Sequence, residues 1–363
     1  MKIGVNARLL AKPNTGIGQW TWNIFEELGK ISKDEFVLVV PEKVDAKFSG
    51  NVKVVVLPER KRGTAGMRKT WWEQVQVPEF FQKEKVDVAI FSYPCNPWTG
   101  DFYKKGMKTV VAVHDTIPWT MREYRRGVLS KMYHGQTRRA VARADMIVTV
   151  SENSKKEIVE ICKVPAEKVF VIYNDAAEVY KKKSDDEALK EFGVEKRKYL
   201  IYCGGYDARK NVTDLLKQYA VFARRHKDIA LVLAGGEFFK EMIESSCGRV
   251  IKTGFLEAEK LAGLYQNALG FVHLSKKEGF NIPLIEAANS GVPLVLSDTA
   301  VHREIAKDKA IFVDEDAVEA MEKLLDEKTW NDYAERAKVL AGHYSWKESA
   351  QKFQKMLSLL SNK

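Results

Sequence analysis

The sequence predicts an α/β protein made of two doubly wound domains, each with a parallel sheet between layers of helices. The chain has 363 residues, which is more than one hydrophobic core usually supports. Short apolar runs rich in β-branched residues alternate with longer amphipathic stretches through both halves. A charge-dense segment, 179–198, interrupts this rhythm between the two halves.

The predicted strands are short, and several are continuously apolar, as in 110–113 and 231–233. Such runs are typical of strands covered on both faces, as in parallel sheets. Helices are expected between the strands, and Trp20, Ile24 and Leu28 mark an apolar helix face after the first one. The expected strands are 2–6, 36–41, 52–57, 87–92, 108–114, 145–150 and 168–173 in the first half, and 199–204, 229–234, 270–275, 293–297 and 310–313 in the second.

The charge-dense segment also sets the predicted domain boundaries. Residues 1–178 are expected to form an N-terminal Rossmann-like domain, 179–198 a linker, and 199–345 a C-terminal Rossmann-like domain. Residues 346–363 form an amphipathic tail. Ligands of such sheets bind at the carboxyl ends of strands, so a crevice between two facing domains is the expected site.

The composition is that of an ordinary globular protein with a net charge of +10. That charge is compatible with an anionic ligand, an anionic membrane surface or nucleic acid. The cations are distributed and no nucleic-acid motif is apparent, so nucleic acid is not the expected partner. The N-terminus lacks a signal-peptide pattern, and no apolar run approaches the roughly 20 residues that span a bilayer. We expect a cytoplasmic protein.

The four cysteines are scattered and form no CxxC pair: Cys95, Cys162, Cys203 and Cys247. Buried free thiols are therefore expected, rather than disulfides or zinc ligands.

The most informative segment is 275–286, Ser-Lys-Lys-Glu-Gly-Phe-Asn-Ile-Pro-Leu-Ile-Glu. Gly279 permits unusual backbone angles, and Pro283 suits the first helical position, where its missing N–H is no loss. Free amides at a helix start suit an anion such as a phosphate. Glu278 and Glu286 bracket this turn, and carboxylates beside a phosphate are better suited to hydroxyl groups. An anion cradle between two such carboxylates fits a sugar nucleotide.

Two segments in the first half follow predicted strands. Gly16 and Gly18 precede a helix, but Thr21 stands where a dinucleotide fingerprint has its third glycine, and a plain turn explains the pair equally well. His114 and Asp115 lie at the end of a buried strand, where ligands of parallel sheets collect.

A third segment follows the first strand of the second half. Gly204 precedes Arg209 and Lys210 on a strand-to-helix turn. Arginine supplies a planar fork of donors and lysine a point charge, a combination that suits a diphosphate.

Together these segments resemble the retaining glycosyltransferases of family 4, mannosyltransferases in particular, which have the GT-B architecture. The segment from Glu278 to Glu286 looks like the E-x7-E signature of the family. The segments around Gly204, Gly16 and His114 resemble its second phosphate element, its N-terminal glycine loop and its sugar-facing histidine. The tail 346–363 resembles the helix that crosses back onto the first domain in this family.

The resemblance implies roles for these residues. Arg209 and Lys210 would hold the donor diphosphate, Glu286 the ribose hydroxyls, and Glu278 and His114 the transferred sugar. One departure is Asn281, which replaces a glycine common in the family's turn; asparagine tolerates left-handed angles better than most residues. The expected catalytic residues are Glu278, His114, Arg209 and Lys210, and the expected donor-binding residues are Gly16, Gly18, Gly204, Arg209, Lys210, Ser275, Glu278, Gly279, Phe280, Asn281, Ile282 and Glu286.

The implied mechanism retains the configuration of the sugar without a covalent enzyme intermediate, and the enzyme mainly orients the reactants and stabilises charge. Two cations at the diphosphate make a metal unnecessary, and no DxD-type cluster occurs where one would be expected. We expect no metal and no cofactor, because the nucleotide sugar is a substrate.

Basic and aromatic residues cluster in two stretches of the first half, a composition that suits an anionic membrane surface. A solvated basic loop would explain the same composition. The residues assigned to a membrane or acceptor surface are Arg68, Lys69, Trp71, Trp72, Arg122, Arg125 and Arg126. If they bind membrane, the protein acts on a lipid-linked glycan at the inner face of the cell membrane.

The expected function is transfer of a hexose, with GDP-mannose favoured over UDP-hexoses, to a glycan acceptor in cell-surface polysaccharide or glycolipid synthesis. One alternative is a GT-B enzyme that uses a UDP-sugar and a small soluble acceptor. A second is a non-catalytic protein that binds a sugar nucleotide or nucleic acid.

Overall fold

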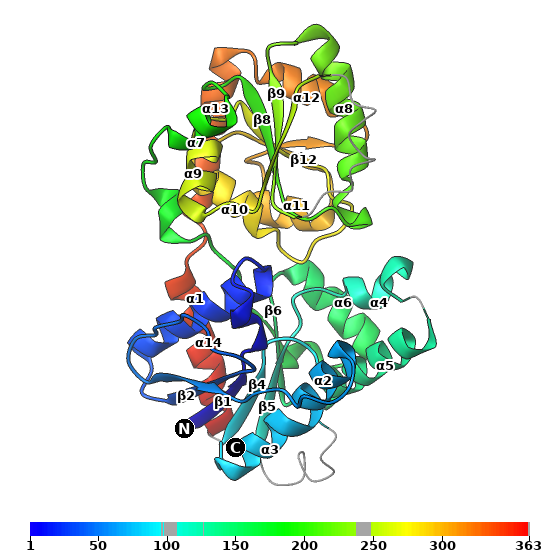
Figure 1. The fold of residues 1–363 in the computed structure, drawn as a ribbon, viewed down its shortest axis with the longest axis vertical. Coiled ribbons are helices and arrows are strands. Elements are labelled where there is room, and N and C mark those ends of the chain that lie inside the picture. The colour runs from blue at the N-terminus through cyan, green and yellow to red at the C-terminus, as the bar shows by residue number, and fades with distance from the viewer. Residues whose placement is uncertain (96, 98–106, 126, 237–247, 362–363) are drawn as a thin grey trace. The chain divides into compact units, whose positions relative to one another are not determined.

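The computed structural model of the chain describes residues 1–95, 97, 107–125, 127–236 and 248–361. The chain divides into two compact units. Unit 1 comprises Met1–Asn174 together with Trp346–Lys363, and unit 2 comprises Asp175–Ser345. Each unit is a parallel sheet with helices on both faces (Figure 1), which confirms the predicted fold class.

Unit 1 contains, in its described residues, a seven-stranded sheet in the order β3-β2-β1-β4-β5-β6-β7 with all neighbours parallel. The chain starts in the middle of the sheet, builds outward to β3, and then returns to build the other side from β4. The loops after β1 and β4 therefore leave the same edge next to each other, at the switch point where doubly wound sheets bind ligands. The strands are β1 (Lys2–Asn6), β2 (Glu35–Val40), β3 (Val52–Val56), β4 (Val88–Phe91), β5 (Lys108–Ala112), β6 (Met146–Thr149) and β7 (Val169–Val171).

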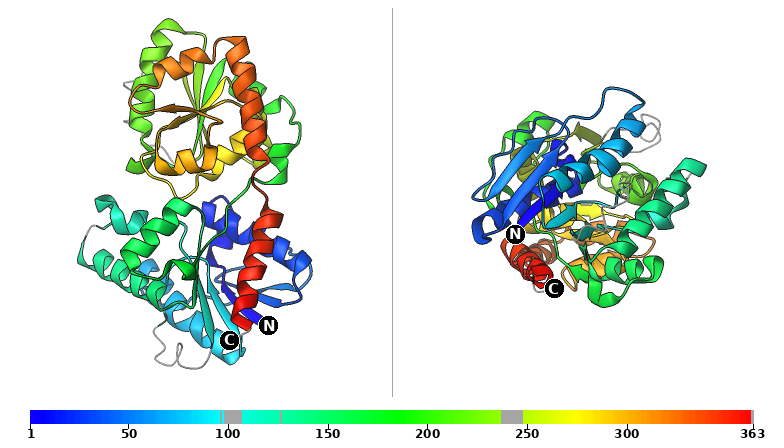
Figure 2. Two further views of the ribbon diagram at one scale, coloured as in Figure 1. Left: turned by 180° about the vertical axis from the view of Figure 1, so that it is seen from behind. Right: turned by 90° about the horizontal axis from the view of Figure 1, so that it is seen from below.

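Helices cover both faces of this sheet. On one face, α14 lies along α1 (Figure 2). Phe353 of α14 packs edge-to-face on Trp20 and Phe25 of α1. The other face holds a core that includes Trp72, Phe81 and Trp119. The helices are η1 (Arg8–Ala11), α1 (Gly16–Ile31), α2 (Ala65–Trp71), η2 (Trp72–Gln76), α3 (Val77–Lys83), α4 (Ile117–Thr120), η3 (Arg122–Tyr124), α5 (Val128–Arg143), α6 (Glu152–Cys162), η4 (Ala166–Lys168) and α14 (Trp346–Ser361).

Unit 2 repeats the same winding in a six-stranded sheet, counted over its described residues, in the order β10-β9-β8-β11-β12-β13. Its switch point lies between β8 and β11, which pair in parallel. The strands are β8 (Tyr199–Cys203), β9 (Ala230–Ala234), β10 (Val250–Gly254), β11 (Gly270–His273), β12 (Leu294–Ser297) and β13 (Ile311–Val313).

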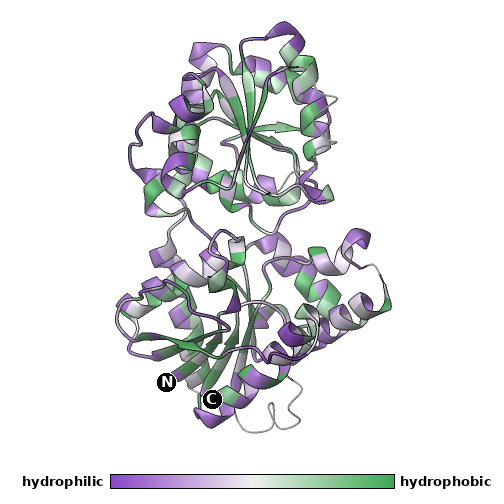
Figure 3. Cartoon of the chain, viewed as in Figure 1, coloured by the Kyte–Doolittle hydropathy of each residue, from purple (hydrophilic) through white to green (hydrophobic). Residues whose placement is uncertain are grey.

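The helices of unit 2 form two groups. In Figure 1, α7, α9 and α13 lie on one side of the sheet and α8 and α12 on the other. Figure 3 shows apolar strands within polar outer helix faces, the pattern of a sheet covered on both sides. The helices are η5 (Glu178–Lys181), α7 (Glu187–Phe192), η6 (Ala208–Lys210), α8 (Val212–Arg225), α9 (Ala258–Asn267), α10 (Ile282–Asn289), α11 (Ala300–Ala306), α12 (Val318–Lys323) and α13 (Glu327–Ala341).

Two features differ from the sequence-based expectation. Each of the twelve predicted strands overlaps an observed one, but β10 was missed because Lys252 and Thr253 interrupt its apolar pattern at the sheet edge. The expected linker, 179–198, belongs to unit 2, where α7 packs against α9, and the boundary lies at Asn174 rather than at 178. The segment is charged because helix α7 has a solvated face, not because it is a tether.

The described cysteines, Cys95, Cys162 and Cys203, are free and buried, and Cys247 lies outside the described residues. In the described part of the chain, no helix is both long enough and apolar enough to cross a bilayer.

Candidate active site

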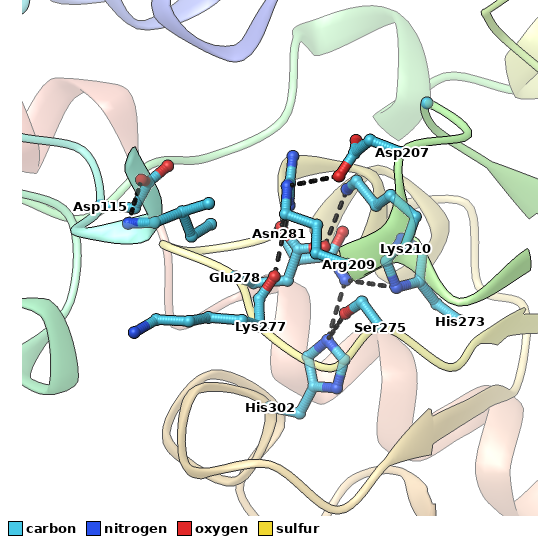
Figure 4. A network of polar contacts seen from close by, with 12 residues as sticks. Asp115, Asp207, Arg209, Lys210, His273, Ser275, Lys277, Glu278, Asn281 and His302 are labelled. Carbon is cyan, nitrogen blue, oxygen red and sulfur yellow. Dashed lines mark hydrogen bonds and ion pairs between the residues drawn. The ribbon is translucent and has the colours of Figure 1, made fainter. Parts of the chain in front are cut away.

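The switch point of unit 2 brings together the two segments that the sequence singled out. The turn after β8 carries Arg209 and Lys210, and the turn after β11 carries Glu278 (Figure 4). Nη1 of Arg209 donates to one oxygen of Glu278 at 2.7 Å, and Nζ of Lys210 donates to the other at 2.8 Å. Nε of Arg209 lies 3.1 Å from Asp207. Residues 68 and 69 positions apart thus form one ion cluster because β8 and β11 are neighbours.

The cluster is largely withdrawn from water. Glu278 is 6% exposed and Lys210 is 7% exposed. Burial alone would raise the pKa of Glu278, but the charges of Lys210 and Arg209 hold this pKa well below its usual range. The carboxylate is therefore ionised, and it fixes two long cationic side chains beside the start of α10 before any ligand arrives.

Helix α10 starts directly after this cluster. Asn281 precedes it with φ of 79°, in the left-handed region, and its side chain does not cap the helix. Asn281, not Gly279, is the left-handed residue of this turn, which corrects the expected use of Gly279. Ile282 is the first helical residue, so Pro283 takes the second position rather than the expected first one, and Glu286 lies in the second turn. Pro283 has no N–H and the amide of Leu284 donates to the carbonyl oxygen of Asn281 at 3.1 Å, so the start of the helix attracts an anion mainly through the positive end of its dipole.

The side chain of Asn281 is inserted between two histidines. Its Nδ2 lies 3.2 Å from Nδ1 of His273 and 3.0 Å from Nε2 of His302 (Figure 4). Nδ1 of His302 lies 2.9 Å from the carbonyl oxygen of Ser297, so this nitrogen carries the proton and Nε2 is the acceptor. Burial lowers the pKa of both rings, which keeps them neutral. The departure from glycine at Asn281 is thus accommodated by partners in β11 and α11.

The remaining residues expected at the donor are placed as follows. Glu286 is buried, and the hydroxyl of Tyr180 is hydrogen-bonded to it. Ser275 is buried, with Oγ 3.4 Å from Nε2 of His302. The side chains of Phe280 and Ile282 are buried in the unit, so only their backbone remains for a ligand.

Gly204 directly follows β8 and has φ of 153°. A Cβ at Gly204 would lie 2.8 Å from the hydroxyl oxygen of Tyr202, so the close approach of this side chain requires a glycine. The chain turns at Gly204 and continues into η6, which carries Arg209 and Lys210.

Unit 1 carries His114 at the carboxyl end of β5. Nε2 of His114 lies 2.9 Å from the carbonyl oxygen of Ser92, and the ring packs edge-to-face on Trp20. Burial lowers the pKa of His114 to about 4. The ring is neutral, donates through Nε2, and presents Nδ1 as an acceptor for a hydroxyl group.

Local packing at the start of α1 explains why Gly18 of the glycine loop is a glycine. Thr15 caps α1 by accepting a hydrogen bond from the N–H of Gly18 at 3.1 Å, so that amide is already occupied. A Cβ at Gly18 would lie 2.3 Å from the carbonyl oxygen of Lys12, and η1 could not pack there. Gly16 is the exposed first residue of α1.

The membrane or acceptor set is only partly at the surface. Trp72 is fully buried, with Nε1 donating to Leu57, so its assignment to a membrane surface is wrong; the helical period turns it into the core. Trp71 is half-buried beneath Arg60. Arg68 pairs with Glu59. Lys69, Arg122 and Arg125 are exposed, and Arg126 lies outside the described residues.

Several site residues escaped sequence reasoning. Asp207 contacts Arg209, His273 and His302 contact Asn281, and Tyr180 contacts Glu286. None of these four residues was identified as a site residue from the sequence. Among the described residues, no group of three or more His, Cys, Asp or Glu side chains is placed to hold a metal ion.

Two family models match the chain, one in each half. "Glycosyltransferase Family 4" matches residues 15–174, and "Glycosyl transferases group 1" matches residues 184–341. The O-antigen chain mannosyltransferase B of Escherichia coli is 26% identical, covering 95% of this chain and 96% of its own. The O-antigen chain mannosyltransferase RfbU of Salmonella typhimurium is 25% identical, over 90% of this chain and 88% of its own.

Solved structures show the same fold at lower identity. HepE of Anabaena, in complex with UDP and glucose, has a TM-score of 0.74 at 15% identity, covering 98% of this chain and 99% of its own. WaaG, a glycosyltransferase involved in lipopolysaccharide biosynthesis, has a TM-score of 0.76 at 13% identity, with the same coverage. These matches confirm the GT-B architecture and the resemblance on which the site was predicted. The chain belongs to the glycosyltransferases, with a family 4 domain followed by a group 1 domain.

Proposed function

We propose that this enzyme transfers mannose, with retention of configuration, from GDP-mannose to a hydroxyl of a lipid-linked glycan in cell-surface polysaccharide synthesis. The ion cluster of Glu278, Arg209 and Lys210 carries the donor part of the proposal. It places two cations beside a helix start, which together suit a diphosphate better than any neutral ligand. The relatives named O-antigen mannosyltransferases favour mannose as the sugar and a polysaccharide as the product.

The proposed chemistry needs only this chain's own residues. Arg209 and Lys210 bind the diphosphate and stabilise the negative charge that grows on it as the sugar departs. Glu286, held by Tyr180, accepts hydrogen bonds from the ribose hydroxyls. Glu278 faces the sugar and stabilises positive charge at the reacting carbon. The leaving phosphate oxygen takes the proton of the attacking hydroxyl on the same face, so no metal is required.

A donor and stereochemistry assay tests this part. The protein is incubated with GDP-mannose, UDP-glucose and UDP-galactose in separate reactions, each with and without EDTA, and binding is followed by thermal shift. We expect a shift and transfer with GDP-mannose and an α-linked product by NMR. A shift confined to UDP-sugars would refute the choice of donor, and loss of transfer in EDTA would refute metal independence.

Membrane association is supported by one exposed surface of unit 1. Helix α5 begins with Val128 and Met132, which are 73% and 57% exposed and lie four residues apart on one helix face. Arg122, Arg125 and Lys131 are exposed in the same segment. Apolar residues with cations around them suit insertion into an anionic membrane surface.

Vesicle pelleting tests this surface. The protein is mixed with vesicles containing phosphatidylglycerol at low salt, and the double variant Val128→Ser/Met132→Ser is compared with Val339→Ser. Val339 is an exposed valine of unit 2, 49% exposed, and serves as the control. We expect the double variant alone to lose binding; equal binding by all three proteins would refute this docking surface.

A further inference from the structure

A pocket of about 380 Å³ lies within unit 1, at the carboxyl ends of its strands. Its wall includes three aromatic side chains, Tyr93, Trp119 and Tyr133, and it also includes His114. Pockets of this size with aromatic walls and a few polar groups bind small organic groups. The lining therefore suits an occupant with both apolar and hydroxyl-rich surfaces.

Three cations line the pocket, Arg8, Lys12 and Lys69, which at first suggests an anionic ligand. Two of these cations, Arg8 and Lys69, are paired with carboxylates that lie behind the pocket wall. Nζ of Lys69 lies 3.7 Å from Glu73, and Nε of Arg8 lies 4.0 Å from the same oxygen. Arg8 forms a second ion pair with Glu59.

Carboxylates balance the remaining charge. Glu42 and Asp115 line the pocket themselves. When the charged partners behind the wall are counted, including Arg68 on Glu59, four cations stand against four carboxylates, Glu42, Glu59, Glu73 and Asp115. The pocket thus has no surplus of positive charge, although the whole chain carries +10.

Glu73 is the unusual member of this set. It is fully buried, and one of its oxygens accepts a hydrogen bond from the hydroxyl of Tyr93 at 2.6 Å. Its second oxygen and both polar atoms of the neighbouring Gln74 are buried without a partner among the described residues. Both residues lie in η2, a π-helical turn between α2 and α3. Such turns are rare and are frequent at functional sites.

A buried carboxylate with an unpartnered oxygen costs stability, so its presence calls for a reason. Glu73 contacts two side chains of the pocket wall, Tyr93 and Lys69. It holds the phenol in one orientation and cancels the charge of the ammonium. Both effects act on whatever occupies the pocket.

We infer that this pocket receives a neutral saccharide end of the acceptor, and that Glu73 is the positioning residue that makes it select a neutral sugar over an anionic one. The inference rests on the proposed function, because it assumes that the acceptor is a glycan. The selectivity would be electrostatic, because the negative charge of Glu73 offsets one positive charge of the pocket wall.

The test uses the purified full chain and two probes, methyl α-mannoside and mannose 6-phosphate, with binding measured by saturation-transfer NMR. The wild-type protein should bind the neutral probe more tightly. Glu73→Gln leaves the ammonium of Lys69 without its carboxylate partner. The affinity for mannose 6-phosphate, relative to that for methyl α-mannoside, should therefore rise by about tenfold. Lys69→Met should move the ratio the opposite way, and the double variant should return near the wild-type ratio.

Glu79→Gln is the matched control, because Glu79 is an exposed glutamate of the following helix, and it should leave the ratio unchanged. Tighter binding of mannose 6-phosphate by the wild type, binding of neither probe, or an unchanged ratio in Glu73→Gln and Lys69→Met would overturn the inference. If Glu73→Gln does not fold, the opposite shift in Lys69→Met still decides. Failure of every nucleotide sugar to support transfer, with the probe ratios as expected, would instead refute the proposed function alone.

Discussion

The substitution Glu278→Gln tests whether the ion cluster of unit 2 is held together by its carboxylate. The change keeps the size of the side chain. It removes the carboxylate that pairs with Nζ of Lys210, and among the described residues no other ion pair of this buried ammonium, 7% exposed, is seen. Removing one partner of a buried pair costs about 3–5 kcal/mol. Arg209 has a side chain that is 20% exposed and retains Asp207, so it adds little.

We take the lower end of that range, about 3 kcal/mol, for the loss of stability of unit 2. For a domain of this size each kcal/mol lowers Tm by about 2–4 °C, so Tm of the transition of unit 2 should fall by about 6–12 °C. The assay is calorimetry of the full chain, with Glu195→Gln, an exposed glutamate of the same unit, as the control. An unchanged Tm would refute the reasoning that Lys210 needs this carboxylate.

Two further measurements separate the electrostatic explanation from simple loss of packing. GDP brings a diphosphate that replaces the missing charge, so its addition should raise Tm more in the variant than in the wild type. The pKa of Glu278 is lowered on folding from 4.5, so its contribution is fully present above pH 4.5 and is lost as pH falls below it. Glu278→Gln should therefore flatten the loss of stability in acid; a parallel decline in both proteins would contradict the explanation.

The other predictions concern single sites. Burial lowers the pKa of His114 from 6.5 to about 4. The free energy of unfolding should therefore be independent of His114 above pH 6.5 and fall by at most about 3 kcal/mol as the pH falls to 4. His114→Phe should remove this dependence in urea titrations. Gly18→Ala should destabilise unit 1 by about 1–3 kcal/mol, measured by thermal unfolding, because its Cβ would meet the carbonyl of Lys12. Asn281→Gly should lower stability by about 1–3 kcal/mol despite its easier backbone, because two histidines lose their donor. Trp72→Ala should cost about 3–5 kcal/mol in urea unfolding and leave vesicle binding of the folded protein unchanged.

Patterns local in the chain could be predicted from the sequence because each depends on neighbouring residues. Apolar runs identified the strands of both sheets, and the segment from Glu278 to Glu286 identified the start of α10. The exception was β10, because an edge strand needs no continuous apolar face. Burial of one tryptophan of the pair, Trp72 rather than Trp71, depended on the helix phase and on the core it meets.

Contacts between distant segments were decided only by the tertiary structure. The sequence determined that Arg209, Lys210 and Glu278 follow strands, and the parallel pairing of β8 with β11 decided that they form one buried cluster. The same holds for Asn281, whose histidine partners come from two other elements, and for Glu73, whose role depends on Tyr93 across the core. The physical reason is that local conformation depends on propensity and turn chemistry, whereas charge pairing and burial depend on which strands lie side by side.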